Sequence, residues 1–393
     1  KLSGGAPTIA FRDLAIQKRE NDLVAASFGR GIYILDDYTP LRHISKQQLE
    51  NESRLFPVRD AWWYIQREKL GGSEKGSQGQ AFFTAPNPPF GAVFRYYLPQ
   101  KIMTQEDERQ KKEKELEKAR KDIPFPGWDK LADEATEASP KIWLTVLDKN
   151  NQVVRRLEGP TKKGFNQVAW DLRYPAPQAV GLQEEAGYNR EPEGYMAAPG
   201  TYQVYMSREV DGELTHVGDT MRFEVKPMHE GALEGAPHEQ VTAFWQKVAD
   251  MQRRASATFR QLDLAKQRIT GLQKALKRAE AAPGQLDEQF HKLRDTLLAI
   301  EQSARGNPAK NQIGERNRPT FASRLQVAVI GTRQSTYGPT QTHKRNLELA
   351  GNMLSKVENR MDTWLNESLP AFEDALQEAG APWVEGQDFP VDE

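Results

Sequence analysis

Two adjacent carboxylates, Asp36 and Asp37, are the first residues that could carry out a reaction. A carboxylate pair could serve a glycoside hydrolase, which needs the two groups about 5–9.5 Å apart across one bond. Neighbouring residues of a strand point to opposite faces, so this pair is poorly placed for that reaction. We interpret one Asp as a cap on the backbone N–H groups of the turn "YTPLR" and the other as the partner of a nearby Arg.

Three consecutive aromatic residues, Trp62, Trp63 and Tyr64, form a second group. Exposed aromatic rings can stack on sugars, and in an extended segment Trp62 and Tyr64 would share a face opposite to Trp63. Aromatic side chains beside a strand usually pack in a core or at its edge, so we favour packing over glycan binding. The binding candidates, with no catalytic residue among them, are Arg30, Asp36, Asp37, Trp62, Trp63 and Tyr64.

The remaining residue types that often do chemistry show no useful pattern. None of the six histidines lies three or four residues from another, and no HExxH motif occurs. The chain has no Cys, which excludes disulfides and thiolate sites. It also has no GxSxG, GxGxxG or phosphate-loop motif. We therefore expect neither a metal nor a cofactor.

The composition indicates a globular chain of several domains. Its 393 residues suggest two or three domains, with 38% hydrophobic and 28% charged residues. The formal net charge of −1 shows no bias toward nucleic acid or an anionic membrane. No run of about 18 apolar residues occurs, so no membrane span is expected. The chain begins at Lys1 without a signal peptide, so we interpret it as a fragment with any export signal upstream.

Residues 1–52 contain two pieces that resemble strands. One is "TIAFRDLAI" (8–16) and the other is "DLVAASFGRGIYILDD" (22–37), with a polar hairpin turn between them. The stretch "SFGRGIYILDDYTPLR" (27–42) reads as one strand closed by a turn. Within it, the glycines of "GRG" are expected to mark a bulge or a close backbone approach.

Residues 53–228 are expected to form an immunoglobulin-like β-sandwich, because many short strands alternate with turn sequences. Ile142, Leu144 and Val146, for example, alternate with period two and would share one face. The strand candidates are 54–66, 91–99, 141–150, 152–159, 164–174, 200–210 and 216–227.

Two segments interrupt this sandwich. "GGSEKGSQGQ" (71–80) has the composition of a flexible loop. The insertion 103–135 contains a stretch, 104–122, that is nearly all charge, with Glu and Lys at helical spacings. We interpret it as a solvated helix. A charged binding arm is the alternative, although both signs are evenly mixed.

Residues 229–393 change to helical periodicity and predict an up-and-down helical bundle. Apolar residues recur every three or four positions from Glu239, and this helix could run through Gly271 as far as Leu276. The last ten residues, "VEGQDFPVDE", are expected to be disordered or loosely packed. Further helices are expected around 286–300, 321–329 and 347–365, with another turn after Pro370.

Several stretches together resemble a known family. They include "VAASFGRGIYILDDYTPLR", "RLFPVRDAWW", "NPPFGAVFRYYL", "GFNQVAWDLRYPAP" and "AAPGTYQVYMS". The chain is similar to the C-terminal part of bacterial sortilin-like, Asp-box (BNR-repeat) β-propeller proteins, often labelled glycosyl hydrolases. The resemblance implies that residues 1–52 supply the terminal strands of a propeller blade and a linker. The Asp-box pattern S-x-D-x-G-x-x-W does not occur in this chain.

The resemblance implies a non-catalytic accessory region that completes and braces a propeller and contributes to protein, peptide or glycan binding. The alternative is part of a secreted glycoside hydrolase whose catalytic residues lie on the propeller. The expected partner is the upstream propeller portion or a second copy of the chain, bound through the strands of 8–37. We expect a glycan or peptide ligand, no nucleic acid, and an exported, periplasmic or extracellular protein.

Overall fold

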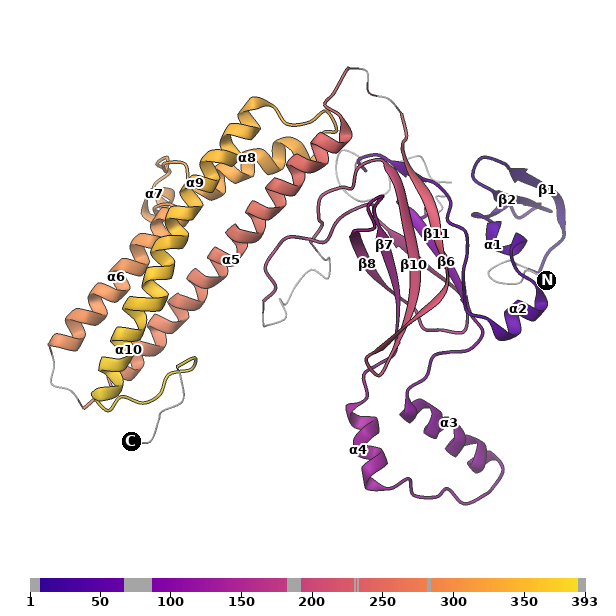
Figure 1. Ribbon diagram of the computed structural model, residues 1–393, viewed down its shortest axis with the longest axis horizontal. Coiled ribbons are helices and arrows are strands. Elements are labelled where there is room, and N and C mark those ends of the chain that lie inside the picture. Colours follow the sequence, from indigo (N-terminus) through magenta and orange to yellow (C-terminus); the bar gives the residue numbers. More distant parts are fainter. Residues whose placement is uncertain are drawn as a thin grey trace. The chain divides into compact units, whose positions relative to one another are not determined.

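We describe the protein from a computed structural model that defines residues 8–66, 87–181, 192–229, 231, 233–280 and 284–387. The chain divides into two compact units. The first comprises Lys1–Tyr174 and Ala197–Glu230, and the second comprises Pro175–Met196 and Gly231–Glu393. The first contains three sheets and the second is helical, so the protein is of mixed α and β structure (Figure 1). We call them the sheet unit and the helical unit and describe each by itself.

The first sheet is an antiparallel meander in the order β1-β2-β3 (Figure 1). Its strands are β1 (Phe11–Gln17), β2 (Asp22–Ser27) and β3 (Ile32–Leu35). The central strand pairs on both sides, and Val24 lies opposite Ile34 of β3. This early strand therefore finds its backbone partners in the segments directly beside it in the sequence.

The prediction of one continuous strand over 22–37 is wrong, because the Gly-Arg-Gly stretch turns the chain back on itself. Gly29 and Gly31 adopt φ angles of +72° and +88°. The N–H and the hydroxyl of Ser27 both donate to the carbonyl of Gly31, at 3.0 and 2.8 Å. The two glycines make a hairpin turn rather than a bulge, since residues with a Cβ rarely adopt this conformation.

Both faces of the first sheet carry exposed apolar side chains. Paired residues share a face, and neighbours along a strand alternate between faces. Leu14 on one face is 62% exposed and Ile34 on the other is 60% exposed. One face holds Phe11, Leu14, Ile16, Leu23, Tyr33 and Leu35, and the other holds Ala15, Val24, Ala26, Ile32 and Ile34. Strands that are apolar on both faces normally lie between two further layers.

Two further sheets form the body of the sheet unit, and we call them the facing sheets. Their strand orders are β5-β11-β10-β7-β8 and β4-β6-β9. All their pairs are antiparallel except that of β5 with β11. The strands are β4 (Arg54–Leu55), β5 (Ala61–Trp63), β6 (Ala92–Leu98), β7 (Lys141–Leu147), β8 (Val153–Gly159), β9 (Gly164–Trp170), β10 (Gly200–Val210) and β11 (Glu213–Pro227). Short helices α1 (Thr39–Arg42) and α2 (Lys46–Asn51) precede β4. The candidate strand 54–66 thus divides into β4 and β5, which join different sheets.

Aromatic side chains from both facing sheets meet in one core. The ring of Trp170 in β9 contacts the edge of Tyr202 in β10, with centroids 5.2 Å apart. Phe94 in β6 meets Phe223 in β11 at 5.7 Å in the same manner. The indole N–H of Trp170 is satisfied by the carbonyl of Arg173 at 2.8 Å. Each sheet therefore covers the apolar face of the other.

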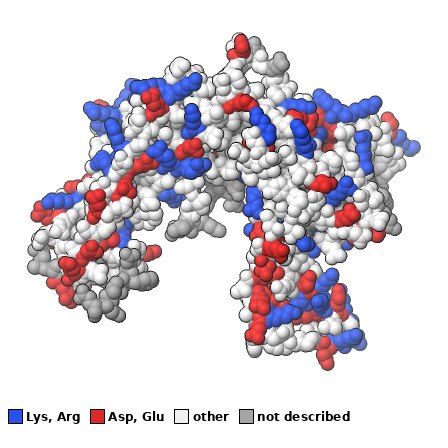
Figure 2. Space-filling model, viewed as in Figure 1, with Lys and Arg blue, Asp and Glu red and all other residues white. Residues whose placement is uncertain are grey.

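A helical hairpin of α3 (Gln105–Lys118) and α4 (Trp128–Thr136) interrupts the facing sheets where the charged insertion was expected. No side chain of α3 is buried, and Figure 2 shows both signs of charge interspersed on this hairpin. Arg109 of α3 ties the two helices together by pairing with Glu134 of α4 at 2.8 Å, and it also pairs with Glu113 of its own helix at 2.8 Å. Paired charges thus hold the hairpin where apolar contacts are few.

The first helix of the helical unit is α5 (His238–Leu276), which has 39 residues and passes through Gly271 as predicted. A stacked pair, Phe259 and Phe321 at 5.2 Å, joins α5 to α8. The other helices are α6 (Gln285–Arg305), α7 (Pro308–Gln312), α8 (Phe321–Arg333), α9 (Gln341–Thr363), the π-helical turn η1 (Trp364–Ser368) and α10 (Leu369–Glu378). The expected helices around 286–300, 321–329 and 347–365 therefore correspond to α6, α8 and α9 with η1.

The start of the tail is more ordered than expected. Arg268 of α5 donates to the carbonyls of Val384, at 3.2 Å, and of Glu385. These bonds hold the first tail residues against α5, because a guanidinium can serve several acceptors at once. The remaining tail, 388–393, and the expected loop 71–80 lie outside the described residues.

Candidate functional site

Asp37 is buried and connects the first sheet to β6. Its carboxylate pairs with Arg95 and accepts the N–H of Thr39 at 3.2 Å. Its own N–H donates to the carboxylate of Asp22 at 2.9 Å. Arg95 also donates to the carbonyl of Asp36 at 3.4 Å. Asp37 alone therefore takes the two roles, turn cap and arginine partner, that were expected to be divided between the pair.

The structure does not bring the six predicted binding residues together. Arg30 lies exposed in the turn between β2 and β3. Trp63 is 5% exposed and its indole N–H donates to a backbone carbonyl at 2.8 Å, so its ring packs in the core as the favoured interpretation expected. The indole N–H of Trp62 donates to the carboxylate of Glu20 at 3.3 Å, and the ring of Tyr64 makes an edge-to-face contact with Phe90. The alternation of Trp62 and Tyr64 against Trp63 is as expected, but these rings make contacts within the protein.

Glu20 provides a second connection between the first sheet and the facing sheets. Its carboxylate pairs with Arg59 at 2.9 Å, and Arg59 also donates to its carbonyl at 3.0 Å. Glu20 lies in the turn between β1 and β2, and Asp37 follows β3, so both connections are at the same end of the sheet. We call this the clamped end.

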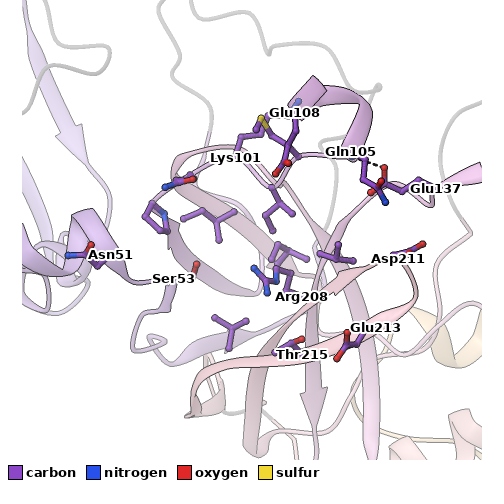
Figure 3. Close-up of a pocket in the computed structure, with 18 residues that line it drawn as sticks. Asn51, Ser53, Lys101, Gln105, Glu108, Glu137, Arg208, Asp211, Glu213 and Thr215 are labelled. Atoms are coloured by element: carbon purple, nitrogen blue, oxygen red, sulfur yellow. Dashed lines mark hydrogen bonds between the residues drawn. The ribbon is translucent and has the colours of Figure 1, made fainter. Parts of the chain in front are cut away.

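A cavity of about 760 Å³ lies beside the facing sheets, between the hairpin of β10 and β11 and the start of α3 (Figure 3). Charged and polar side chains from several elements surround it, among them Lys101 and Arg208. Its apolar lining consists of Leu98, Pro99, Ile102, Met103, Ile142, Val210 and Val217. Eleven of its eighteen lining residues are polar or charged, so it is a mainly polar cavity, unlike the predominantly apolar pockets that bind most small molecules.

Arg208 points into the middle of this cavity (Figure 3). It continues the inward alternation of Val204 and Met206, which are fully buried. In the register it lies between Ile142 of β7 and Thr215 of β11. No residue in the described part of the chain forms a hydrogen bond or ion pair with its guanidinium. Arg208 is itself exposed, so its guanidinium is an unpaired, solvent-accessible cation where the buried side chains of β10 end and the cavity begins.

Four carboxylates surround this arginine, those of Glu108, Glu137, Asp211 and Glu213 (Figure 3). The carboxylate of Glu137 accepts the backbone N–H of Gln105 at 2.7 Å. The chain turns sharply at Asp211, whose φ is +51°, and at the glycine after it, whose φ is +79°. Such values at both central residues are typical of a type I′ hairpin turn, which presents Asp211 and Glu213 beside the cavity.

The second cation of the cavity, Lys101, is already neutralised. Its ammonium donates to Asp107 at 2.7 Å. This hydrogen bond is the main cause that holds the pKa of Asp107 below its usual value, and partial burial opposes it. The cavity therefore combines one free guanidinium with an excess of negative charge, which suits a ligand that carries both signs.

The cavity was not predicted, although one signal for it exists in the sequence. In "GTYQVYMSREV" the period-two series of Tyr202, Val204 and Met206 continues to Arg208, so a charge follows the apolar stripe where the strand becomes exposed. A strand that carries a charge on its apolar face predicts either a buried ion pair or an opening there. Sequence alone does not say where the opposing sheet ends.

Neither metal ligands nor a membrane-spanning helix occur in the described residues. There, no three His, Asp or Glu side chains gather in a way that could hold a metal ion. None of the helices described there is long and apolar enough to cross a bilayer. Comparison with known protein families, curated proteins and solved structures found no match to this chain.

Proposed function

We propose that this chain is a non-catalytic accessory region that completes and braces a sortilin-like, Asp-box β-propeller and contributes to protein, peptide or glycan binding. In this proposal β1–β3 belong to a propeller blade, the facing sheets are an immunoglobulin-like sandwich and the helical unit is a bundle. The protein would be exported. The similarity of "GRGIYILDD" and the stretches around it to that family supports this assignment.

The observation that carries the proposal is the pair of exposed apolar faces on the first sheet. A propeller blade lies between two neighbouring blades, so both of its faces must be apolar. Blades typically have four strands, and this sheet has three. Within the described residues no further strand pairs with the outer edges of β1 and β3. A strand from the propeller could therefore complete the blade while its neighbours cover the two faces.

The clamped end supports the bracing role. The ion pairs of Glu20 with Arg59 and of Asp37 with Arg95 hold this sheet against the facing sheets. A propeller that includes the sheet would thus be supported from the side by the sandwich. No observation on the described residues favours the glycoside hydrolase alternative, whose catalytic carboxylates would lie on the propeller.

The test uses the uncovered faces. In the absence of a propeller, we expect the chain to self-associate as its concentration rises, because association removes large apolar patches from water. Leu14→Lys and Ile34→Lys, one on each face, should keep it monomeric in light scattering. Ile330→Lys on α8 is the matched control, since Ile330 is 61% exposed. This control should associate like the wild type.

Two results would overturn the proposal. The first is a monodisperse wild-type monomer with fast amide exchange across residues 22–37. The second is hydrolysis of any member of a polysaccharide panel by this chain alone, which would contradict the non-catalytic role.

A further inference from the structure

Within the described residues, the first part of strand β11 has one edge without a strand partner. β10 pairs with one side of it, whereas β5 on the other side pairs only with Val225–Pro227. The backbone of Leu55 comes near at Gly218. Residues 213–217 have no strand on that side within the described parts of the chain. Alternate N–H and C=O groups of this stretch are thus available, and such an edge is a template for an added strand.

The same stretch lines the cavity. Glu213, Thr215 and Val217 all belong to its lining, and Thr215 pairs directly with Arg208 (Figure 3). A strand added beside β11 would therefore place every second side chain over the cavity. It would lie two strand spacings, about 9.6 Å, from β10. A long guanidinium can cross that distance to an acidic side chain, because Thr215 between them is short.

We propose that the β11 edge at 213–217 binds an extended peptide segment of a partner protein with the sequence pattern apolar–x–acidic–x–basic. This inference rests on the binding role proposed above and names the class of ligand.

Each position of the pattern follows from one cavity residue. The acidic residue lies opposite Thr215 and supplies the partner that Arg208 lacks. The basic residue lies opposite Glu213, with Asp211 nearby in the turn. The apolar residue lies opposite Val217. Cross-strand pairs of opposite charge stabilise a sheet and like charges destabilise it, so the pattern fixes the register of the peptide. The direction follows from antiparallel pairing, which is slightly more stable than parallel pairing.

The experiment measures fluorescence anisotropy of a labelled peptide with Val-Thr-Glu-Thr-Lys at its centre, titrated with the full chain. We expect saturable binding that Arg208→Glu weakens by about tenfold or more, because it removes the central charge pair. A peptide with Lys in place of Glu should bind Arg208→Glu better than wild type. Peptide binding should also slow amide exchange at 213–217.

The matched control is Arg222→Glu. Arg222 is exposed on the same strand but on the outer face, since its neighbour Phe223 is buried in the core. It should bind the peptide as wild type does. Equal losses in both variants would overturn the proposal, and so would protection at 22–37 instead of 213–217. Tighter binding of the reversed sequence would overturn the antiparallel assignment.

A second control separates this inference from the proposed function. Ile34→Lys alters the first sheet but not β11, so it should leave peptide affinity unchanged. Absence of peptide binding in a chain whose first sheet self-associates as expected would refute the peptide site alone.

Discussion

The first sheet and the facing sheets consist of similar strands but differ in what covers them. Ile142 of β7 has no exposed surface, whereas Ile34 of β3 is 60% exposed. Each facing sheet buries one apolar face against the other. The first sheet has two apolar faces, and large side chains on both stay exposed. Strand pairing and burial are therefore separate properties, because neighbouring strands make a sheet and a second layer makes a core.

The strongest test of this difference compares two truncations. Trp170→Ala removes a fully buried ring from the facing sheets and should lower the free energy of unfolding by about 3–5 kcal/mol. Ile32→Ala in β3, at a residue 68% exposed, should change it by about 0.5 kcal/mol or less. Urea unfolding measures both. Similar losses would show that the first sheet is as well packed as the core.

The next test releases the clamped end. Arg95→Leu leaves the buried carboxylate of Asp37 without its partner and should cost about 3 kcal/mol. Amide exchange should accelerate in β1–β3, and adding Asp37→Asn should restore much of the protection. Arg30→Leu is the control, because Arg30 is exposed in the turn of the same sheet. Equal exchange in the Arg95 and Arg30 variants would mean that the ion pair does not hold the sheet.

A smaller effect is expected from two hairpin glycines. Gly212 and Gly31 have φ angles of +79° and +88°, and an added Cβ would meet no atom within 4 Å at either. The cost of Ala there is therefore conformational, about 1 kcal/mol. Gly212→Ala should lower the free energy of unfolding by that amount. Gly31→Ala should change only amide exchange in β2 and β3, and a loss of global stability would contradict the comparison.

The smallest expected effect on stability comes from two tyrosines of the facing sheets, and it appears only at alkaline pH. Burial raises the pKa of Tyr96 and of Tyr202 above the ordinary value. The folded protein thus keeps protons that the unfolded chain releases above about pH 10, so stability falls as pH rises past that point. Tyr202→Phe should reduce the slope of the urea midpoint against pH. An unchanged alkaline slope would exclude this residue as a cause.

The regular parts of the fold could be predicted because their signals are local. Alternation located β6 to β11 within a few residues, and three- and four-residue spacing located α5. The turn at Gly29–Gly31 was missed because a glycine in a strand sequence fits a bulge or a hairpin equally well. Which of the two forms depends on whether the next segment returns to pair with β2.

The site was less predictable because it depends on contacts distant in sequence. The sequence favours packing for the three aromatic residues 62–64, but it does not show that Trp63 finds its acceptor in the distant segment at Ala197. Arg208 continues an inward stripe, but the cavity around it forms only where residues 98–103 and the start of α3 line its other side. The position at which one layer ends and another begins is a tertiary property. No local spacing specifies it.

The clamped end also has a mechanical consequence. Glu20 and Asp37 hold one end of the first sheet, while the turn with Arg30 is exposed at the other end of β2. With a rise of about 3.4 Å per residue, that turn lies roughly 20 Å from the clamp. The sheet is therefore anchored at one end, so a small rotation about Glu20 and Asp37 would move the turn at Arg30 through a much larger distance. A force that acts near Arg30 would be resisted mainly by the ion pairs of Glu20 and Asp37 at the clamped end.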